Sequence, residues 1–203
     1  MLNRLRSGMT RVLTPVAAAL LRAGVSPDAV TVAGTVAVVA AALWLFPAGH
    51  LLAGALVVSF FALTDSLDGV MARQAGRSSS WGAFLDSTLD RFGDAAIFGG
   101  LVLWFYGGGD HEATAVLALV CLVLGSVVPY ARARAEGLGM TAAVGIAERA
   151  DRLFAVLAAA ALVGVGAPRV VLTVVLALLA VASAVTVVQR MATVRRQSLG
   201  ASS

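Results

Sequence analysis

The chain has 203 residues, of which 60% are hydrophobic, and its mean hydropathy is +0.92. This composition excludes an ordinary soluble globular protein and indicates a multi-span membrane protein, which we expect to form one domain over residues 1–203. The net charge is +4, and all fifteen basic residues are arginines that flank apolar segments. Such arginines favour contacts with anionic lipid headgroups and argue against a nucleic-acid partner.

Residues 1–23 are predicted to form an amphipathic helix that lies in the membrane interface. Apolar side chains recur there at helical spacing, with arginines between them. The apolar positions are Leu2, Leu5, Met9, Val12, Leu13, Val16 and Leu20. A cleaved signal peptide is the alternative, but Pro15 interrupts the apolar part and no small-residue cleavage pattern follows.

Six apolar segments follow and predict an all-α integral membrane protein, with six transmembrane helices bundled over residues 28–195. Ser26 and Pro27 supply a capping residue and a proline at the first helical position. The predicted spans are 27–46, 51–73, 81–106, 113–135, 149–166 and 169–190. Each approaches the roughly 20 residues that cross a bilayer, and an even number of spans places both termini on one side.

The distribution of arginines predicts the orientation in the membrane. Arg169 is the only arginine in the loops opposite the termini, and Arg91 lies within the third span. The others lie on the side of the termini: Arg4, Arg6, Arg11, Arg22, Arg73, Arg77, Arg132, Arg134, Arg149, Arg152, Arg190, Arg195 and Arg196. The positive-inside rule therefore places this side, with both termini, at the cytoplasmic face of the cell membrane.

Four aspartates lie on the second and third spans, close to the hairpin that joins them. Asp65 and Asp68 are three residues apart, and Asp86 and Asp90 are four apart, so each pair lies on one helix face. Four carboxylates near a bilayer need cations. An all-oxygen ligand set favours Mg²⁺, Mn²⁺ or Ca²⁺, and two such ions would balance the four charges.

The segment from Asp65 to Asp90 reads D-x2-D-G-x2-A-R-x8-G-x3-D-x3-D, which resembles the signature of the CDP-alcohol phosphotransferases. These are integral-membrane enzymes of phospholipid synthesis. The resemblance implies transfer from a CDP-alcohol to an acceptor alcohol with release of CMP, an active site at the cytosolic face, and a homodimer. It also implies that Asp65, Asp68, Asp86 and Asp90 bind two Mg²⁺ ions, with Mn²⁺ as a substitute, and that Asp90 is the general base.

The same resemblance suggests residues that bind the CDP-lipid. Residues 28–31 are similar to the P-N-x-x-T segment of the family, which contacts the nucleotide, with aspartate in place of asparagine. Gly69 would let the nucleotide approach the helix because it has no Cβ, and the Arg73 guanidinium suits a phosphate. The candidates are Asp28, Ala29, Val30, Thr31, Gly69, Arg73 and Ser79.

A second set of arginines, Arg132, Arg134, Arg152 and Arg190, suits an acceptor that carries a phosphate. Each of them is equally well explained as an anchor at the membrane rim. Beyond the signature, the runs LTDSLDG, LDSTLDR and ERADRL resemble the actinobacterial phosphatidylinositol-phosphate synthases. That resemblance implies inositol 1-phosphate as acceptor, bound by these four arginines, although Pro129 and Arg132 stand where it implies serine and lysine.

Several alternatives stay open at this stage. A phosphatidylglycerol-phosphate synthase would use glycerol 3-phosphate, which is also anionic. A divalent-cation channel would need an ion path through the membrane, but spans three to six carry no ionisable residue near mid-depth beyond Asp94. A purely structural network of the aspartates with Arg73 and Arg91 would leave excess negative charge. Asp94 fits an acceptor pocket, support of the site, or a plain structural hydrogen bond.

Overall fold

The structure, a computed structural model, describes residues 13–76, 79–146 and 148–200, without the side chains of residues 63–66. These residues form helices and connecting turns, with no β-strand among them. After a short N-terminal helix, Leu13–Arg22, the helices are α2 (Pro27–Leu45), α3 (Leu51–Gln74), α4 (Ser80–Tyr106), α5 (Glu112–Glu136), α6 (Arg149–Gly164) and α7 (Val170–Gly200). The predicted all-α class is therefore confirmed.

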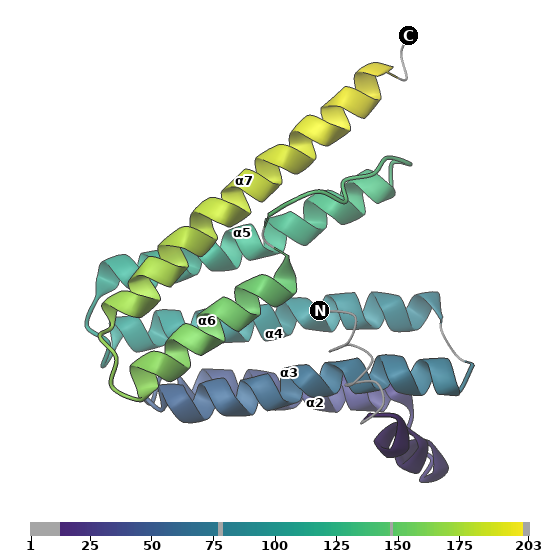
Figure 1. Ribbon diagram of the computed structural model, residues 1–203, viewed down its shortest axis with the longest axis horizontal. Helices are drawn as coiled ribbons and strands as arrows, with labels where there is room; N and C mark the ends of the chain where they lie inside the picture. Colours follow the sequence, from purple (N-terminus) through teal and green to yellow (C-terminus); the bar gives the residue numbers. More distant parts are fainter. Residues whose placement is uncertain (1–12, 77–78, 147, 201–203) are drawn as a thin grey trace.

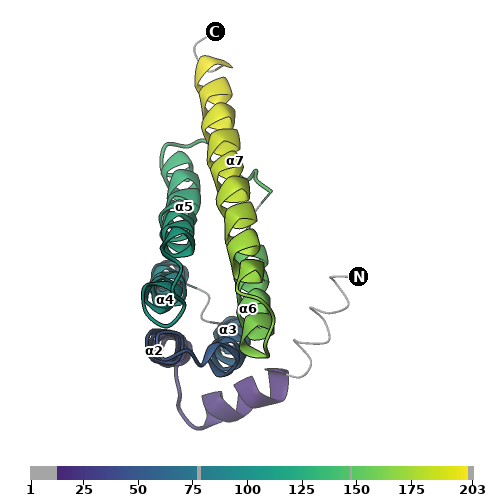
Figure 2. The same ribbon diagram turned by 90° about the vertical axis from the view of Figure 1, so that its left-hand side faces the viewer.

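The helices pack in two layers, which Figure 2 shows clearly. One layer holds α2, α4 and α5, and the other holds α3, α6 and α7; α2 packs on α3 and α5 on α7 across the layers. In Figure 1, α5 and α7 diverge from the lower helices toward one end of the bundle, and the short helix α6 begins inside that opening. The first residues of α6 are thereby placed beside the middle of the molecule.

Local sequence explains where these helices begin. The Ser26 hydroxyl accepts a hydrogen bond from the backbone N–H of Ala29 at 3.2 Å, and Pro27 occupies the first turn of α2. The Ser79 hydroxyl caps α4 in the same way, accepting from the Gly82 N–H at 3.0 Å. At α6, Glu148 and Asp151 form a reciprocal capping box. The caps of α2 and α4 lie at the end of the bundle that was predicted to carry the site, and that of α6 lies beside the middle of the molecule.

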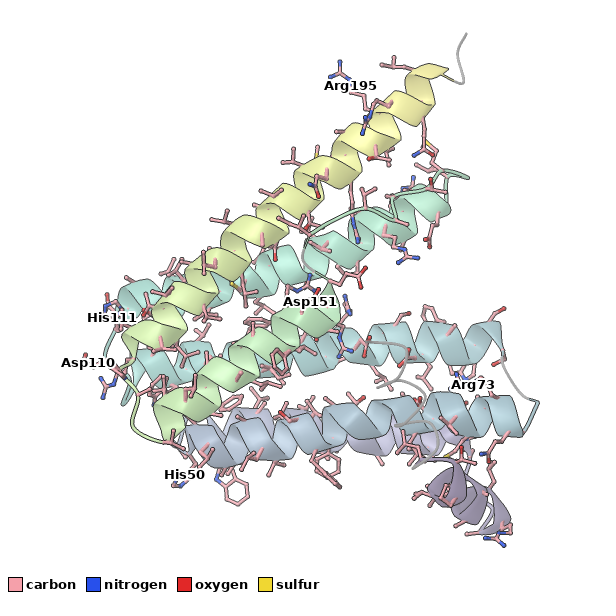
Figure 3. All side chains as sticks on the ribbon, in the orientation of Figure 1. His50, Arg73, Asp110, His111, Asp151 and Arg195 are labelled. Atoms are coloured by element: carbon pink, nitrogen blue, oxygen red, sulfur yellow. The ribbon has the colours of Figure 1, made fainter. Side chains whose placement is uncertain are left out.

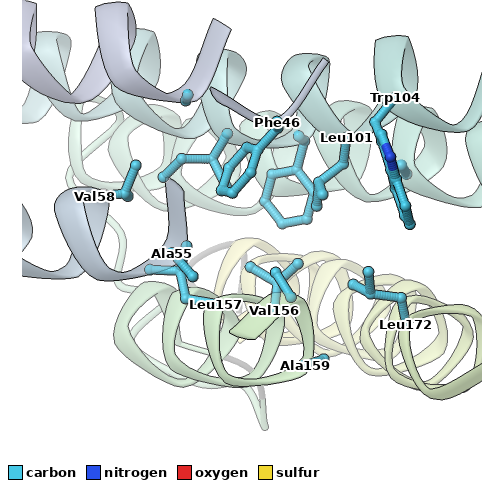
Figure 4. Close-up of a cluster of buried hydrophobic side chains, with 14 of the residues drawn as sticks. Phe46, Ala55, Val58, Leu101, Trp104, Val156, Leu157, Ala159 and Leu172 are labelled. Atoms are coloured by element: carbon cyan, nitrogen blue, oxygen red, sulfur yellow. The ribbon is translucent and has the colours of Figure 1, made fainter. Parts of the chain in front are cut away.

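A single large apolar core joins the helices at the opposite half of the bundle (Figure 4). Phe46, Leu101 and Leu172 are each buried completely and come from three different segments. Glycines let the helix backbones approach there. A Cβ at Gly100 would collide with the backbone of α2, and one at Gly164 with the start of α3. The apolar contacts that hold the bundle together thus lie mainly in this half, and the pockets described below lie in the half with the charged residues.

In the described part of the chain, four helices are long and apolar enough to cross a membrane by themselves: Pro27–Leu45, Leu51–Gln74, Glu112–Glu136 and Val170–Gly200. The other two predicted spans coincide with α4 and α6. α4 carries its charges in its first half, and α6 has only 16 residues, which extend about 24 Å at 1.5 Å per residue. α7 also continues ten residues beyond the predicted end at residue 190, to Gly200.

The N-terminal helix packs against the end of α3. Ala17 is completely buried beside Val70 and Met71, with Leu13 and Leu20 around them. The Gln74 amide donates to the Thr14 carbonyl at 3.2 Å. In residues 13–22, part of the apolar face that was predicted to meet lipid is thus covered by α3. Residues 1–12 of the predicted interfacial helix lie outside the described part.

Candidate active site

A pocket of about 600 Å³ opens between the first turn of α2, the last turns of α3 and the first turns of α4. Three carboxylates and one guanidinium face it, with small residues that leave room for a ligand. Its lining is Ser26, Pro27, Asp28, Thr31, Asp68, Gly69, Ala72, Arg73, Ser79, Gly82, Ala83 and Asp86. Most residues predicted to bind the CDP-lipid therefore face one space.

Asp68 is the most enclosed carboxylate of this pocket, with 9% of its surface exposed. The hydroxyl of Thr31, which is itself buried, donates to the Asp68 carboxylate and lies 3.2 Å from the Pro27 carbonyl. Because a buried charge is costly unless it is hydrogen-bonded, this contact both orients and stabilises the carboxylate. Thr31 was predicted to touch the nucleotide, and its hydroxyl is directed at Asp68.

The mouth of the pocket brings together three further predicted residues. The Arg73 guanidinium lies over Gly69, where an added Cβ would stand 3.4 Å from its Nη1 atom. The Asp28 carboxylate accepts a hydrogen bond from the indole of Trp81 at 3.0 Å, which ties α2 to the start of α4. Ser79 lines the pocket while it caps α4.

Some predicted residues are not among the pocket lining. Ala29 and Val30 do not line it. Asp65 belongs to α3, but its side chain lies outside the described part. Among the side chains that are described, no three His, Cys, Asp or Glu residues lie close enough to hold a metal ion together. A complete ligand set for two ions is thus not seen in the described residues.

Asp90 belongs to a different cluster, one turn beyond Asp86 on α4. Its carboxylate lies 2.8 Å from Nη1 of Arg149, the first residue of α6. The Nε atom of the same arginine donates to Asp94 at 3.0 Å. Arg91 stands near both carboxylates, with its Nη2 atom 3.7 Å from Asp90 and 3.6 Å from Asp94. Two arginines therefore balance the two aspartates.

A second pocket, of about 330 Å³, lies between α4, α5, α6 and α7. Its lining includes five arginines and two glutamates: Arg91, Arg132, Arg149, Arg152, Arg190, Glu136 and Glu148. Arg152 and Arg190 are only 3% and 7% exposed. The Nε and Nη1 atoms of Arg91 are buried without a hydrogen-bond partner among the described residues. An excess of buried guanidinium groups favours an anion as the ligand.

Pro129 explains how one of these arginines is held. A proline inside α5 has no N–H for the carbonyl four residues earlier, which is that of Gly125. The Arg152 Nη2 atom lies 3.5 Å from this carbonyl. Arg190 reaches α5 as well, donating to the Val128 carbonyl, and its Nε donates to Val144 at 2.9 Å. The proline therefore leaves an acceptor on α5 for a buried arginine.

The fourth arginine of the predicted acceptor set is placed differently. Arg134 is exposed and does not line the second pocket. Arg132 does line it and forms an exposed ion pair with Glu136 at 2.8 Å. Three of the four predicted arginines therefore share this pocket.

Residues 24–185 match the sequence profile of the CDP-alcohol phosphatidyltransferases. The protein belongs to this family. Relatives in the family are phosphatidylinositol phosphate synthases. The one from Streptomyces avermitilis is 51% identical over 98% of this chain and 84% of its own length. The one from Cutibacterium acnes is also 51% identical, over 97% of this chain and 98% of its own.

Two solved structures of the family have closely similar folds. The crystal structure of Mycobacterium tuberculosis phosphatidylinositol phosphate synthase with CDP-DAG bound has a TM-score of 0.88, at 46% identity over 91% of this chain and 94% of that one. The same enzyme in complex with manganese and citrate has a TM-score of 0.86, over 90% and 88%. These similarities agree with the predicted family and with the predicted resemblance to phosphatidylinositol-phosphate synthases.

The chemistry of the first pocket fits the divalent ions that this family implies. Asp68 and Asp86 come from two antiparallel helices and face one space, so they would offer oxygen ligands to an ion bound there. Asp65 precedes Asp68 by one turn of α3. The residues most suited to hold an ion are therefore Asp65, Asp68 and Asp86, with Asp90 as a fourth candidate.

Two residues of the site were not predicted from the sequence. Arg149 contacts both Asp90 and Asp94, and Trp81 holds Asp28. Arg149 lies in the ERADRL run that carries the resemblance, but its contacts join α6 to α4 across the fold. In the sequence, Trp81 stands out only as an aromatic residue with an indole N–H donor at the start of a predicted helix, close to the aspartate-bearing segment.

Replacing Thr31 by valine should weaken divalent-ion binding. Valine keeps the shape of threonine but removes the hydroxyl that donates to Asp68, and loss of such supporting hydrogen bonds typically costs about 10- to 100-fold in metal affinity. We expect a rise of this size in the Mn²⁺ dissociation constant, measured by calorimetry on detergent-solubilised protein. Thr31→Ser retains the hydroxyl and should bind Mn²⁺ as the parent does; equal affinity in Thr31→Val would contradict the supporting role.

Proposed function

We propose that this protein transfers the phosphatidyl group from CDP-diacylglycerol to inositol 1-phosphate, giving phosphatidylinositol phosphate and CMP, with Mg²⁺ or Mn²⁺ as the required ion. The observation that carries the proposal is the pairing of two pockets through α4. Asp86 faces the carboxylate pocket, and one turn later Asp90 contacts an arginine that lines the second pocket. The relatives' names and the CDP-DAG and manganese complexes support this choice of substrates and ion.

The roles of the residues follow from their places. The carboxylates of the first pocket would hold the ions, which, when bound, offset the charge of the pyrophosphate and of the departing CMP. Arg73, lying over Gly69, would contact a phosphate of the CDP-lipid. The lining residues Asp28 and Ser79 would meet the nucleotide, with Trp81 fixing the position of Asp28.

Group transfer needs a base at the acceptor hydroxyl. We assign this role to Asp90, because its helix passes from the first pocket to the second. Asp90 would take the hydroxyl proton as the oxygen bonds to the phosphorus beside the diacylglycerol. The bond between that phosphorus and CMP breaks, and CMP leaves with the electron pair. Arg152, Arg190 and Arg132 would hold the phosphate of the acceptor.

The arrangement in the membrane belongs to the same proposal. We place residues 1–203 in one domain whose six helices, α2 to α7, cross the cell membrane. We further propose that the protein is a homodimer, with both pockets and both termini on the cytoplasmic side. Figure 3 supports the orientation: Arg73 and Arg195 lie toward one end of the molecule, and His50, Asp110 and His111 lie at the other. Labelling of Cys121→Ala/Arg195→Cys by an impermeant maleimide should occur only from the cytoplasmic side.

The assignment of the acceptor is tested by CMP release. Purified protein in mixed micelles receives CDP-diacylglycerol and Mg²⁺ with inositol 1-phosphate, glycerol 3-phosphate or inositol. We expect CMP release with inositol 1-phosphate, and loss of release when a chelator removes the ion. Release with glycerol 3-phosphate alone would instead identify a phosphatidylglycerol-phosphate synthase, and no release with any acceptor would refute the proposal.

A further inference from the structure

One cluster of charged residues lies between the two pockets. Asp90 and Asp94 are one turn apart on α4, and Arg149 at the start of α6 reaches both. The exposed fraction of the side chain is 30% for Arg149, 17% for Asp90 and 9% for Asp94. The deeper carboxylate is thus the more enclosed one.

The geometry uses two different nitrogens of one guanidinium. Nη1 lies 2.8 Å from Oδ1 of Asp90, and Nε lies 3.0 Å from Oδ1 of Asp94. The guanidinium is planar, so fixing its Nε edge on Asp94 also fixes the direction of Nη1. A lysine ammonium is a point charge on a flexible stem and has no such second edge.

The backbone of Arg149 is also held in place. It is the first residue of α6, and the capping box of Glu148 and Asp151 defines where that helix starts. The Glu148 N–H donates to the Asp151 carboxylate at 3.3 Å. In Figure 3, Asp151 lies where α6 begins, in the opening between the diverging helices. The arginine therefore extends from a fixed point toward α4.

We infer that Arg149 is a positioning residue for Asp90, and that Asp94 acts through it by holding the Nε edge of its guanidinium. Arg149 also lines the second pocket. It thereby fixes the Asp90 carboxylate relative to the bound acceptor, so that the carboxylate meets the acceptor hydroxyl in one orientation. Misplacing a reacting group by a small distance is costly in rate, even when binding is unchanged.

This inference rests on the proposed function, since it presumes that Asp90 serves the acceptor. The inference gives Asp94 the role of holding Arg149, without any contact of Asp94 with substrate or ion. Arg91 approaches the other oxygens of the two carboxylates at the longer distances of 3.7 and 3.6 Å. Arg91 therefore balances charge in the cluster, while the shorter contacts to Arg149 set the orientation.

The test compares Arg149→Lys and Asp94→Leu with the parent protein, since leucine has a size similar to aspartate and no oxygen to accept from the Nε atom of Arg149. We expect each variant to lose about 10- to 100-fold in kcat, because Asp90 is no longer held in position in the transition state. The KM for CDP-diacylglycerol should change by less than about threefold, because lipid binding is unaffected. Mn²⁺ affinity should not weaken, since Arg149 is a cation beside the carboxylates and its replacement does not remove a ligand. The double variant should be no slower than the slower single variant, because both changes break one unit.

Arg169→Lys is the matched control. Arg169 lies at the other end of the bundle, where its Nη1 atom donates to the Gly109 carbonyl at 2.7 Å, so this change should leave kcat unaltered. Full kcat in Arg149→Lys would overturn the inference, because charge alone would then suffice. A loss of kcat that follows a lower unfolding temperature or weaker Mn²⁺ binding would also overturn it.

The proposed function can fail independently of this inference. The parent protein is assayed in the same series with inositol 1-phosphate and glycerol 3-phosphate, and the variants are measured with whichever acceptor releases CMP. A different acceptor would change the proposed function and leave the test of Arg149 intact.

Discussion

Replacing Asp90 by asparagine is expected to lower kcat by about 1000-fold, or roughly 4 kcal/mol, within the range that a general base contributes. Asparagine has nearly the same size and still accepts a hydrogen bond from Arg149, but it cannot take the proton of the acceptor hydroxyl. The fold should persist, because α4 is held by its cap and by the core at its other half. CMP release under saturating substrates measures the loss.

Asp110→Asn is the matched control for this variant. Asp110 is an exposed acid in the turn before α5, at the end of the molecule away from the pockets (Figure 3). Its backbone has φ +44°, a conformation that asparagine also adopts. The control should keep full activity. Near-normal turnover in Asp90→Asn, with unfolding temperature unchanged, would show that Asp90 is not the base.

Much of the fold could be predicted because its signals are local. The Ser26-Pro27 pair and the apolar segment predicted from residue 81 place α2 and α4 within a residue or two of their observed starts. The spacing of Asp65 to Asp90 predicts a hairpin that carries carboxylates on facing helices. For these features, the determining contacts lie within one turn of the chain or across one short connection.

The unpredicted parts depend on contacts between distant residues. The sequence does not show that Arg149 reaches 55 residues back to Asp94, or that the carbonyl freed by Pro129 lies beside Arg152. It also does not show that Arg134, two residues from Arg132, is exposed outside the second pocket. Arginines at a membrane rim look alike in sequence, and only helix packing separates those that enter a pocket from those that do not.

Replacing Arg152 by methionine should raise the KM for the phosphorylated acceptor about 100-fold, or roughly 2.7 kcal/mol, which is the scale of a charge-assisted hydrogen bond lost in a buried site. The KM for CDP-diacylglycerol should change by less than about threefold, because Arg152 does not line the first pocket. Methionine keeps most of the apolar stem of the arginine. Initial rates over a grid of both substrate concentrations separate the two constants.

The stability of this variant distinguishes binding from a structural role. Arg152 is 3% exposed and shares its pocket with four other arginines, so its removal relieves repulsion between like charges as well as the cost of burying one of them. The unfolding temperature of Arg152→Met should stay close to that of the parent, because loss of the contact to the Gly125 carbonyl offsets this gain. Arg195→Met removes a positive charge from an exposed position near the end of α7 and should leave both KM values unchanged. If both KM values instead rise together in Arg152→Met, the arginine acts as an anchor of the helices and not as a ligand of the acceptor.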